Sequence, residues 1–245
     1  MFTVGCGGSR GRRGRAVRVV LVTLGLVVAV AIWSPAHSRA DTRYPVLLVH
    51  GGFLGSPANF SKMIERLRAD HYDPYTVDLG LVGNDTAANA KKISARVDEV
   101  LAATGAPKVH LVGHSMGGLS ARYYIKVLGG LSHVASYTAF GTPQHGNVHG
   151  CPLVADQCPN GEFLQTLNRG DDTPGSIRYT SIASKQELDE ADGTLTRLDH
   201  GACLPLVDSG PHGDEPNNLV IYQAVKDGLN STCPSGWTDL PDITP

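Results

Sequence analysis

The pentapeptide Gly113-His-Ser-Met-Gly117 constrains the fold of this chain more than any other feature of the sequence. It follows an apolar, β-branched run at 108–112 and precedes a helix-like run at 118–127. A tight turn from a strand into a helix strains its central residue and crowds the backbone on both sides, so glycine is needed where a Cβ would clash. This context predicts that Ser115 is a nucleophile, held outward at the start of a helix whose free N–H groups favour negative charge.

The first 40 residues have the three parts of a secretory signal peptide. Five arginines and no acidic residue precede an apolar run at 19–33, and the small residues Ser38 and Ala40 stand before a predicted cleavage site at Asp41. The apolar run is shorter than the roughly 20 residues that cross a bilayer, which favours cleavage over a membrane anchor. We therefore expect a secreted, extracellular protein with one domain over residues 41–245.

Charge and cysteine content narrow the class of protein. Cleavage after residue 40 leaves 15 basic and 23 acidic residues, a formal net charge of −8. Such a surface is a poor match for nucleic acid, so we expect no nucleic-acid partner. Four cysteines remain after cleavage, an even number that suits disulfides in an oxidising compartment, and their spacing is not that of a metal site. The least entangled of three pairings is predicted, Cys151–Cys158 with Cys203–Cys233.

Strands alternate with amphipathic helices along the rest of the chain. This alternation predicts an α/β fold, a compact and mostly parallel sheet with helices on both faces. The predicted strands cover 44–50, 75–79, 108–113, 134–140, 176–182 and 204–207, and the predicted helices cover 57–70, 86–103, 119–127 and 216–229. Ligands bind at the carboxyl ends of such strands, so the loops that follow several strands are expected to converge on one site. The long segment 141–176 is typical of a lid or binding loop.

A serine hydroxyl needs a base, and the base needs an acid that fixes its tautomer. His212 lies in a Gly/Pro loop between the last predicted strand and the last helix, from where an imidazole can reach the Ser115 turn. His200 is the alternative base. The other histidines after the turn fit this role less well. His133 precedes a strand and so lies at the wrong edge of the sheet, and His145 and His149 come too early in chain order.

The acid is expected just past the strand that ends near residue 182. Spacing alone does not choose among the four candidates there, which are Glu187, Asp189, Glu190 and Asp192.

A second motif, His50-Gly-Gly-Phe53, directly follows the first buried strand. Its glycines let the backbone bend so that one of its N–H groups can meet the N–H of Met116. Two such donors form an oxyanion hole.

Five segments together resemble the secreted bacterial lipases of class 2, which are small α/β-hydrolases. They are Tyr44-Pro-Val-Leu-Leu-Val-His-Gly-Gly52, Val112-Gly-His-Ser-Met-Gly-Gly118, Gly141-Thr-Pro-Gln-His-Gly146, Arg178-Tyr-Thr-Ser-Ile182 and Arg197-Leu-Asp199. The resemblance covers about residues 44–230. It implies the α/β-hydrolase fold, hydrolysis of acylglycerols without a cofactor, and a small or absent lid.

Carried over residue by residue, the resemblance makes Ser115 the nucleophile and His212 the base, with Met116 and Gly52 as oxyanion donors. One extra residue in this loop leaves Phe53 as the alternative donor.

The family's acid is an aspartate five positions after the isoleucine of the Tyr-Thr-Ser-Ile segment. That position is Glu187 here, and a small gap would select Asp189 instead.

The sequence therefore predicts a secreted serine hydrolase that cleaves carboxylic esters, most of all acylglycerols, through an acyl-enzyme. We expect a lipid or ester substrate, transient contact with a lipid interface, no metal and a monomeric chain. The alternatives are an esterase for short soluble esters, an acyltransferase, and a catalytically inactive binding module. Reactivity of Ser115 toward a fluorophosphonate separates the last of these from the enzymes, because only an activated serine reacts readily.

Overall fold

The computed structural model describes residues 43–52, 55–80, 85–185 and 196–233. Six strands form one sheet in the order β2-β1-β3-β4-β5-β6, and every neighbouring pair is parallel. The strands are β1 (Val46–Val49), β2 (Pro74–Val77), β3 (Val109–His114), β4 (Val134–Phe140), β5 (Arg178–Ser184) and β6 (Leu206–Val207). The predicted α/β fold with a parallel sheet is confirmed.

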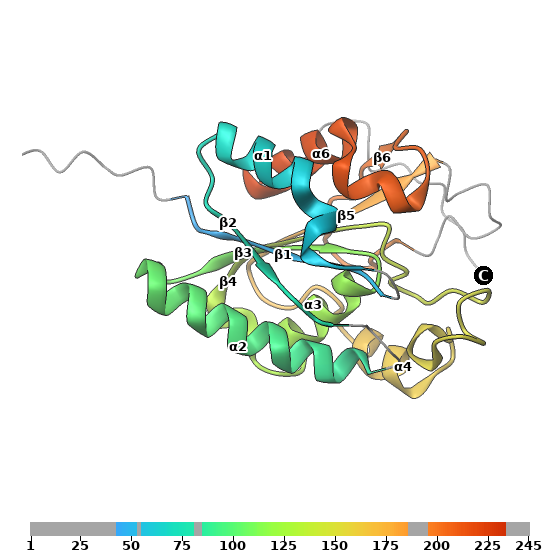
Figure 1. Ribbon diagram of the computed structural model, residues 1–245. Coiled ribbons are helices and arrows are strands. Elements are labelled where there is room, and N and C mark those ends of the chain that lie inside the picture. The colour runs from blue at the N-terminus through green and yellow to red at the C-terminus, as the bar shows by residue number, and fades with distance from the viewer. Residues whose placement is uncertain (1–42, 53–54, 81–84, 186–195, 234–245) are drawn as a thin grey trace, which may run out of the picture. The chain divides into compact units, whose positions relative to one another are not determined.

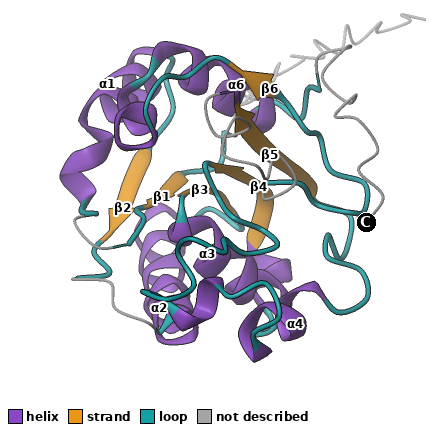
Figure 2. Cartoon of the chain, turned by 90° about the vertical axis from the view of Figure 1, so that its right-hand side faces the viewer, coloured by secondary structure: helices purple, strands orange, loops and turns teal. Residues whose placement is uncertain are grey.

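Helices cover both faces of this sheet, as predicted. The α-helices are α1 (Ser61–Ala69), α2 (Thr86–Thr104), α3 (Met116–Lys126), α4 (Glu162–Asn168) and α6 (Leu219–Leu229). Short 3-10 helices are η1 (Pro57–Phe60), η2 (Gly130–His133), η3 (Ala155–Gln157) and η5 (His212–Asn217). Figure 1 and Figure 2 both show α1 and α6 on one side of the sheet and α2, α3 and α4 on the other.

Strand β1 shows why the central strands are continuous apolar runs in the sequence. Successive side chains of a strand point to opposite faces, and both faces here are covered. Leu47 and Val49 belong to the apolar cluster that includes residues of α2 and α3, and Val46 and Leu48 belong to the cluster that includes residues of α1 and α6. All four side chains are fully buried.

One of the two helix starts near the site differs from the sequence prediction. Helix α3 begins at Met116, directly after Ser115, as expected for a serine at the start of a helix. The predicted last helix instead begins at Leu219, because 212–217 form the 3-10 helix η5 with Pro216 inside it. Proline has no N–H to donate within an α-helix, which accounts for the separate short helix.

The predicted disulfide pairing is confirmed, with bonds Cys151–Cys158 and Cys203–Cys233. The first bond lies in the segment 141–176, which also contains η3 and α4 and is therefore more structured than a plain loop. In the second, Cys203 lies beside β5, where its N–H donates to the carbonyl oxygen of Tyr179.

The predicted signal peptide and the boundary at residue 40 lie outside the described residues and stay predictions. Within the described ranges, none of the helices combines the length and apolar character needed to cross a bilayer.

Candidate active site

Ser115 joins β3 to α3 in a backbone conformation that L residues rarely adopt. Its φ is 55° and its ψ is −133°. The turn is held on both sides, because the N–H of Ser115 donates to the carbonyl oxygen of Phe140 and its own carbonyl oxygen accepts from the hydroxyl of Thr142 at 2.9 Å. Strain of this kind persists only where the surroundings enforce it, and it concentrates at functional sites. The predicted strand–turn–helix context is confirmed.

The glycines on either side of Ser115 are there because the backbone passes too close for a side chain. A Cβ on Gly113 would lie 2.5 Å from the Cα of Gly118. A Cβ on Gly117 would lie 2.4 Å from the carbonyl oxygens of Val49 and His50. The turn therefore packs tightly against its own helix and against the end of β1. The sequence predicted the need for glycine at both positions but not the contact with β1.

The glycine loop after β1 lies directly against this turn. A Cβ on Gly51 would be 2.7 Å from the Cβ of Ser115, and a Cβ on Gly52 would be 2.7 Å from the sulfur of Met116. The predicted oxyanion donors Gly52 and Met116 are thus neighbours. The alternative donor Phe53 lies outside the described residues.

His212 is the first residue of η5 and lies beside the turn. Its ring centroid is 4.7 Å from that of His114, the residue before Ser115. A Cβ on Gly141, which follows β4, would lie 2.8 Å from Cε1 of His212. The segment after β6 therefore brings His212 next to the Ser115 turn, although its imidazole side chain remains 46% exposed.

A buried carboxylate that the sequence analysis missed accompanies His212. Oε2 of Glu215 lies 3.2 Å from Nδ1 of His212, and the Glu215 side chain has no exposed surface. His212 and Glu215 are three residues apart, which matches one turn of a 3-10 helix, and this spacing was the available signal. The sequence analysis began the last helix at residue 216 and did not use it. The predicted acid Glu187 and its alternatives Asp189, Glu190 and Asp192 lie outside the described residues.

The structure gives the alternative base His200 a different partner. Its Nδ1 lies 2.9 Å from Oδ1 of the buried Asp172, in the segment that precedes β5. Hydrogen bonding to Asp172, together with the negative charge of that residue, raises the pKa of His200.

The three remaining histidines fit the role of base no better. His133 ends η2 at the amino end of β4, away from the carboxyl ends where Ser115 lies. Nε2 of His145 lies 3.5 Å from Oδ1 of Asp199, and His149 is exposed.

Three groups of side chains in the described ranges have the spacing of metal ligands. They are His114 with His212 and Glu215, His145 with Asp172 and Asp199, and Asp171 with Asp172 and His200. Asp172 belongs to two of them, yet it already accepts hydrogen bonds from the N–H groups of Asp199 and His200. Its charge is therefore held by the protein itself, and we assign no metal to the two groups that contain it.

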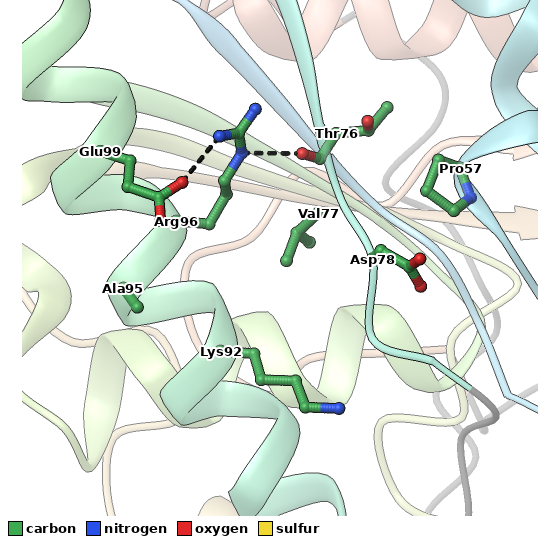
Figure 3. A pocket seen from close by; sticks show the side chains of 8 residues that line it. All are labelled: Pro57, Thr76, Val77, Asp78, Lys92, Ala95, Arg96 and Glu99. Carbon is green, nitrogen blue, oxygen red and sulfur yellow. Dashed lines mark hydrogen bonds and ion pairs between the residues drawn. The ribbon is translucent and has the colours of Figure 1, made fainter.

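A surface pocket lies at the other edge of the sheet, between β2 and α2 (Figure 3). Its cationic side chains are already engaged. Arg96 donates to the carbonyl oxygen of Thr76 and to Glu99, and Lys92 donates to the carbonyl oxygen of Leu79. None of the eight residues that line this pocket is a serine, cysteine or histidine.

Comparison with known proteins agrees with this geometry. A family model for the alpha/beta hydrolase fold matches residues 44–158. Triacylglycerol lipases of Burkholderia plantarii and Vibrio cholerae are 38% and 34% identical to the chain over 149 and 163 residues. These matches cover 54% and 62% of this chain but 40% and 51% of the relatives, so the chain spans about half or less of their length.

Solved structures show the same fold at low identity. A mature lipase of Bacillus licheniformis superposes with a TM-score of 0.65 at 19% identity and covers 77% of this chain and 93% of that one. Aspergillus fumigatus lipase B gives a TM-score of 0.64 at 18% identity, over 78% of this chain and 54% of that one. Together with the sheet order, these likenesses show that the chain has the α/β-hydrolase fold.

Proposed function

We propose that this protein is a serine hydrolase that cleaves carboxylic esters, acylglycerols above all. The observation that carries the proposal is the strained Ser115 at the junction of β3 and α3, with His212, from the segment after β6, beside the adjoining residue His114. A strained turn that exposes a serine next to an imidazole is the arrangement that activates a hydroxyl for attack on an acyl carbon. The curated triacylglycerol lipases with which the chain shares 34–38% identity support the ester class.

In this proposal the Ser115 oxygen attacks the acyl carbonyl while His212 takes the hydroxyl proton. The negative charge that forms on the carbonyl oxygen is stabilised by the backbone N–H groups of Met116 and Gly52. The alcohol then leaves with the proton from His212, and an acyl group remains on Ser115. Water enters, gives a proton to the same imidazole and releases the acid.

The acid of the triad is assigned to Glu187 by the family resemblance alone, and this assignment stays a prediction. The role is to keep one tautomer of His212 and to stabilise its cation.

Contact with a lipid interface is part of the proposal. Large apolar side chains are exposed on two segments that follow strand ends, Leu153 at 67% and Leu219 at 61%. Leu219 begins the helix directly after η5, and Leu153 lies in the disulfide-closed loop after β4. Apolar groups on the segments around a site suit a substrate that is itself apolar and aggregated.

Secretion is also proposed, from the signal-peptide pattern of residues 1–40. The two disulfides suit an oxidising compartment outside the cytosol.

A rate profile over p-nitrophenyl esters of increasing chain length tests the function. We expect hydrolysis by the wild type that rises above the solubility limit of the longer esters, and covalent labelling of Ser115 by a fluorophosphonate. A rate that stays highest with short soluble esters would indicate an esterase instead. Transfer of the acyl group to an added alcohol in preference to water would indicate an acyltransferase. Absence of both labelling and hydrolysis would contradict the proposal and favour a binding module.

A further inference from the structure

Three side chains that can bind a metal ion converge next to the Ser115 turn. His114 is the last residue of β3, and His212 and Glu215 lie one turn apart in η5. One ligand atom from each of the three residues lies within 4.8 Å of those of the other two. Of the three groups with ligand spacing in the described ranges, this is the one that does not include Asp172.

The distances between these atoms suit a zinc ion. Oε2 of Glu215 lies 3.2 Å from Nδ1 of His212 and 3.4 Å from Nε2 of His114. Zinc binds imidazole nitrogen and carboxylate oxygen at about 2.0–2.2 Å in a tetrahedron, which sets neighbouring ligand atoms roughly 3.3–3.5 Å apart. Two histidines and a glutamate are also a ligand set that zinc uses with its fourth position open. Two of the three distances therefore already match a zinc site.

The carboxylate oxygen at the centre of this group lacks a hydrogen bond. Oε2 of Glu215 is buried, and no described residue meets it with hydrogen-bond geometry, although two imidazole nitrogens are near. Burial raises the pKa of this carboxyl, but contacts with His114 and His212 outweigh burial, so the net effect is a lowered pKa. A buried carboxylate oxygen of this kind is stabilised by a cation beside it, and an ionised carboxylate is the form that binds a metal.

Contacts behind the ligands hold two of them in place. The hydroxyl oxygen of Ser209 lies 3.1 Å from Oε1 of Glu215, and it donates there because an ionised carboxylate can only accept. The ring of His114 stacks on that of Phe140, with centroids 5.0 Å apart. Contacts of this kind orient metal ligands and raise the affinity of a metal site.

The loop after β4 keeps the space beside two of the ligand atoms clear. Gly141 has a φ of +55°, and a Cβ there would lie 2.3 Å from Oε2 of Glu215 and 2.9 Å from Nδ1 of His212. Both the backbone conformation and the lack of room for a side chain require glycine. The side chain of His212 is 46% exposed, so an ion has a path from solvent to this group.

We propose that His114, His212 and Glu215 form an inhibitory site for a zinc ion. Binding is independent of the proposed function, but its effect on turnover rests on that function. A neutral imidazole has one nitrogen that carries a proton and one that accepts. When zinc occupies Nδ1 of His212, the proton of that nitrogen moves to Nε2. Nε2 then cannot take the hydroxyl proton of Ser115, and hydrolysis stops.

The first test measures hydrolysis of p-nitrophenyl butyrate at rising zinc concentration in a buffer that does not chelate. The wild-type rate should fall to near zero at saturating zinc and return when EDTA is added. Magnesium at the same concentration should not inhibit, because it prefers oxygen ligands. His114→Gln removes one ligand, so its half-inhibitory zinc concentration should rise by roughly 10-fold or more, as even an outer-shell change causes at metal sites.

Each variant is compared with its own rate without metal, so a change in basal activity does not affect the result. His200→Gln is the matched control, because it removes a histidine from another group with ligand spacing. It should keep the wild-type half-inhibitory concentration. Equal values for His114→Gln and the wild type, or a rise in His200→Gln instead, would overturn the assignment.

Equilibrium dialysis with zinc separates the site from the proposed function. Ser115→Ala keeps all three ligands, and it should bind one zinc ion more per chain than the Ser115→Ala/His114→Gln double variant. Equal binding by the two proteins would refute the site. The expected binding by a wild-type chain that hydrolyses no ester would support the site and contradict the proposed function. If His114→Gln does not fold, Glu215→Gln takes its place in the dialysis and should lose the same ion.

Discussion

Nε2 of His50 accepts a hydrogen bond of 3.0 Å from the backbone N–H of Leu79. Because that nitrogen accepts, the proton of this buried ring is on Nδ1, which lies 2.8 Å from the carbonyl oxygen of Gly51 and donates to it. His50 therefore ties the glycine loop after β1 to the chain just past β2. This glycine loop places Gly52 against Met116.

Replacing His50 by leucine should reduce both stability and turnover. The change leaves the buried N–H of Leu79 without an acceptor, at a cost of about 1–3 kcal/mol in the free energy of unfolding. A displaced Gly52 N–H should lower kcat by roughly 10²-fold or more, as loss of one oxyanion donor does elsewhere. Urea unfolding and ester kinetics measure the two effects. Asp78→Asn is the control, because this exposed carboxylate is 3.8 Å from the same ring and its loss should change neither quantity much.

Ser115→Ala should abolish esterase activity and leave the fold intact. Alanine keeps the backbone of the turn, while removal of a triad nucleophile costs up to about a millionfold in kcat. The unfolding midpoint should stay close to that of the wild type. Ser120→Ala is the matched control, a buried serine in α3 whose hydroxyl donates to the carbonyl oxygen of Met116. A Ser115→Ala variant with a tenth of the wild-type rate would contradict the nucleophile assignment.

The sequence was most informative at positions where the local backbone geometry allows only one type of residue. The glycines at 113 and 117 and the apolar run before them predicted the turn at Ser115, because no other residue fits where the backbones meet. The parallel sheet followed from strands that are apolar on both faces.

The surroundings of His212 were harder to predict from the sequence. The sequence analysis did not single out Glu215, since its burial depends on His114, Ser209 and Gly141, three residues far apart along the chain. The burial of such a carboxylate depends on tertiary contacts, and these cannot be predicted from residue spacing within one segment.

Loss of the Cys203–Cys233 bond should harm activity as well as stability. The chain-entropy model gives about 3.5 kcal/mol for a loop of this length and about 2.5 kcal/mol for the shorter Cys151–Cys158 loop. The longer bond encloses η5 and α6, and so holds the segment that carries His212 against β5. A Cys203→Ser/Cys233→Ser double variant should lose more kcat than a Cys151→Ser/Cys158→Ser variant assayed at the same temperature, after both are shown to be folded. Equal losses would show that the longer bond acts on stability alone.

The contact between His200 and Asp172 should make stability depend on pH. The hydrogen bond that Asp172 accepts from the His200 ring and the negative charge of Asp172 raise the folded-state pKa of His200 above the ordinary value. A raised pKa means that the folded protein binds this proton more tightly than the unfolded chain does. The stabilisation is therefore complete below the unfolded pKa of about 6.5 and is lost as pH rises through the folded pKa. His200→Gln should lower Tm at pH 5.5 by more than it does at pH 8.5. The control is His149→Gln, a change at an exposed histidine of the loop after β4, for which the Tm difference should not vary in this way. A His200→Gln effect that is the same at both pH values would show that the contact is not a charged pair in the folded protein.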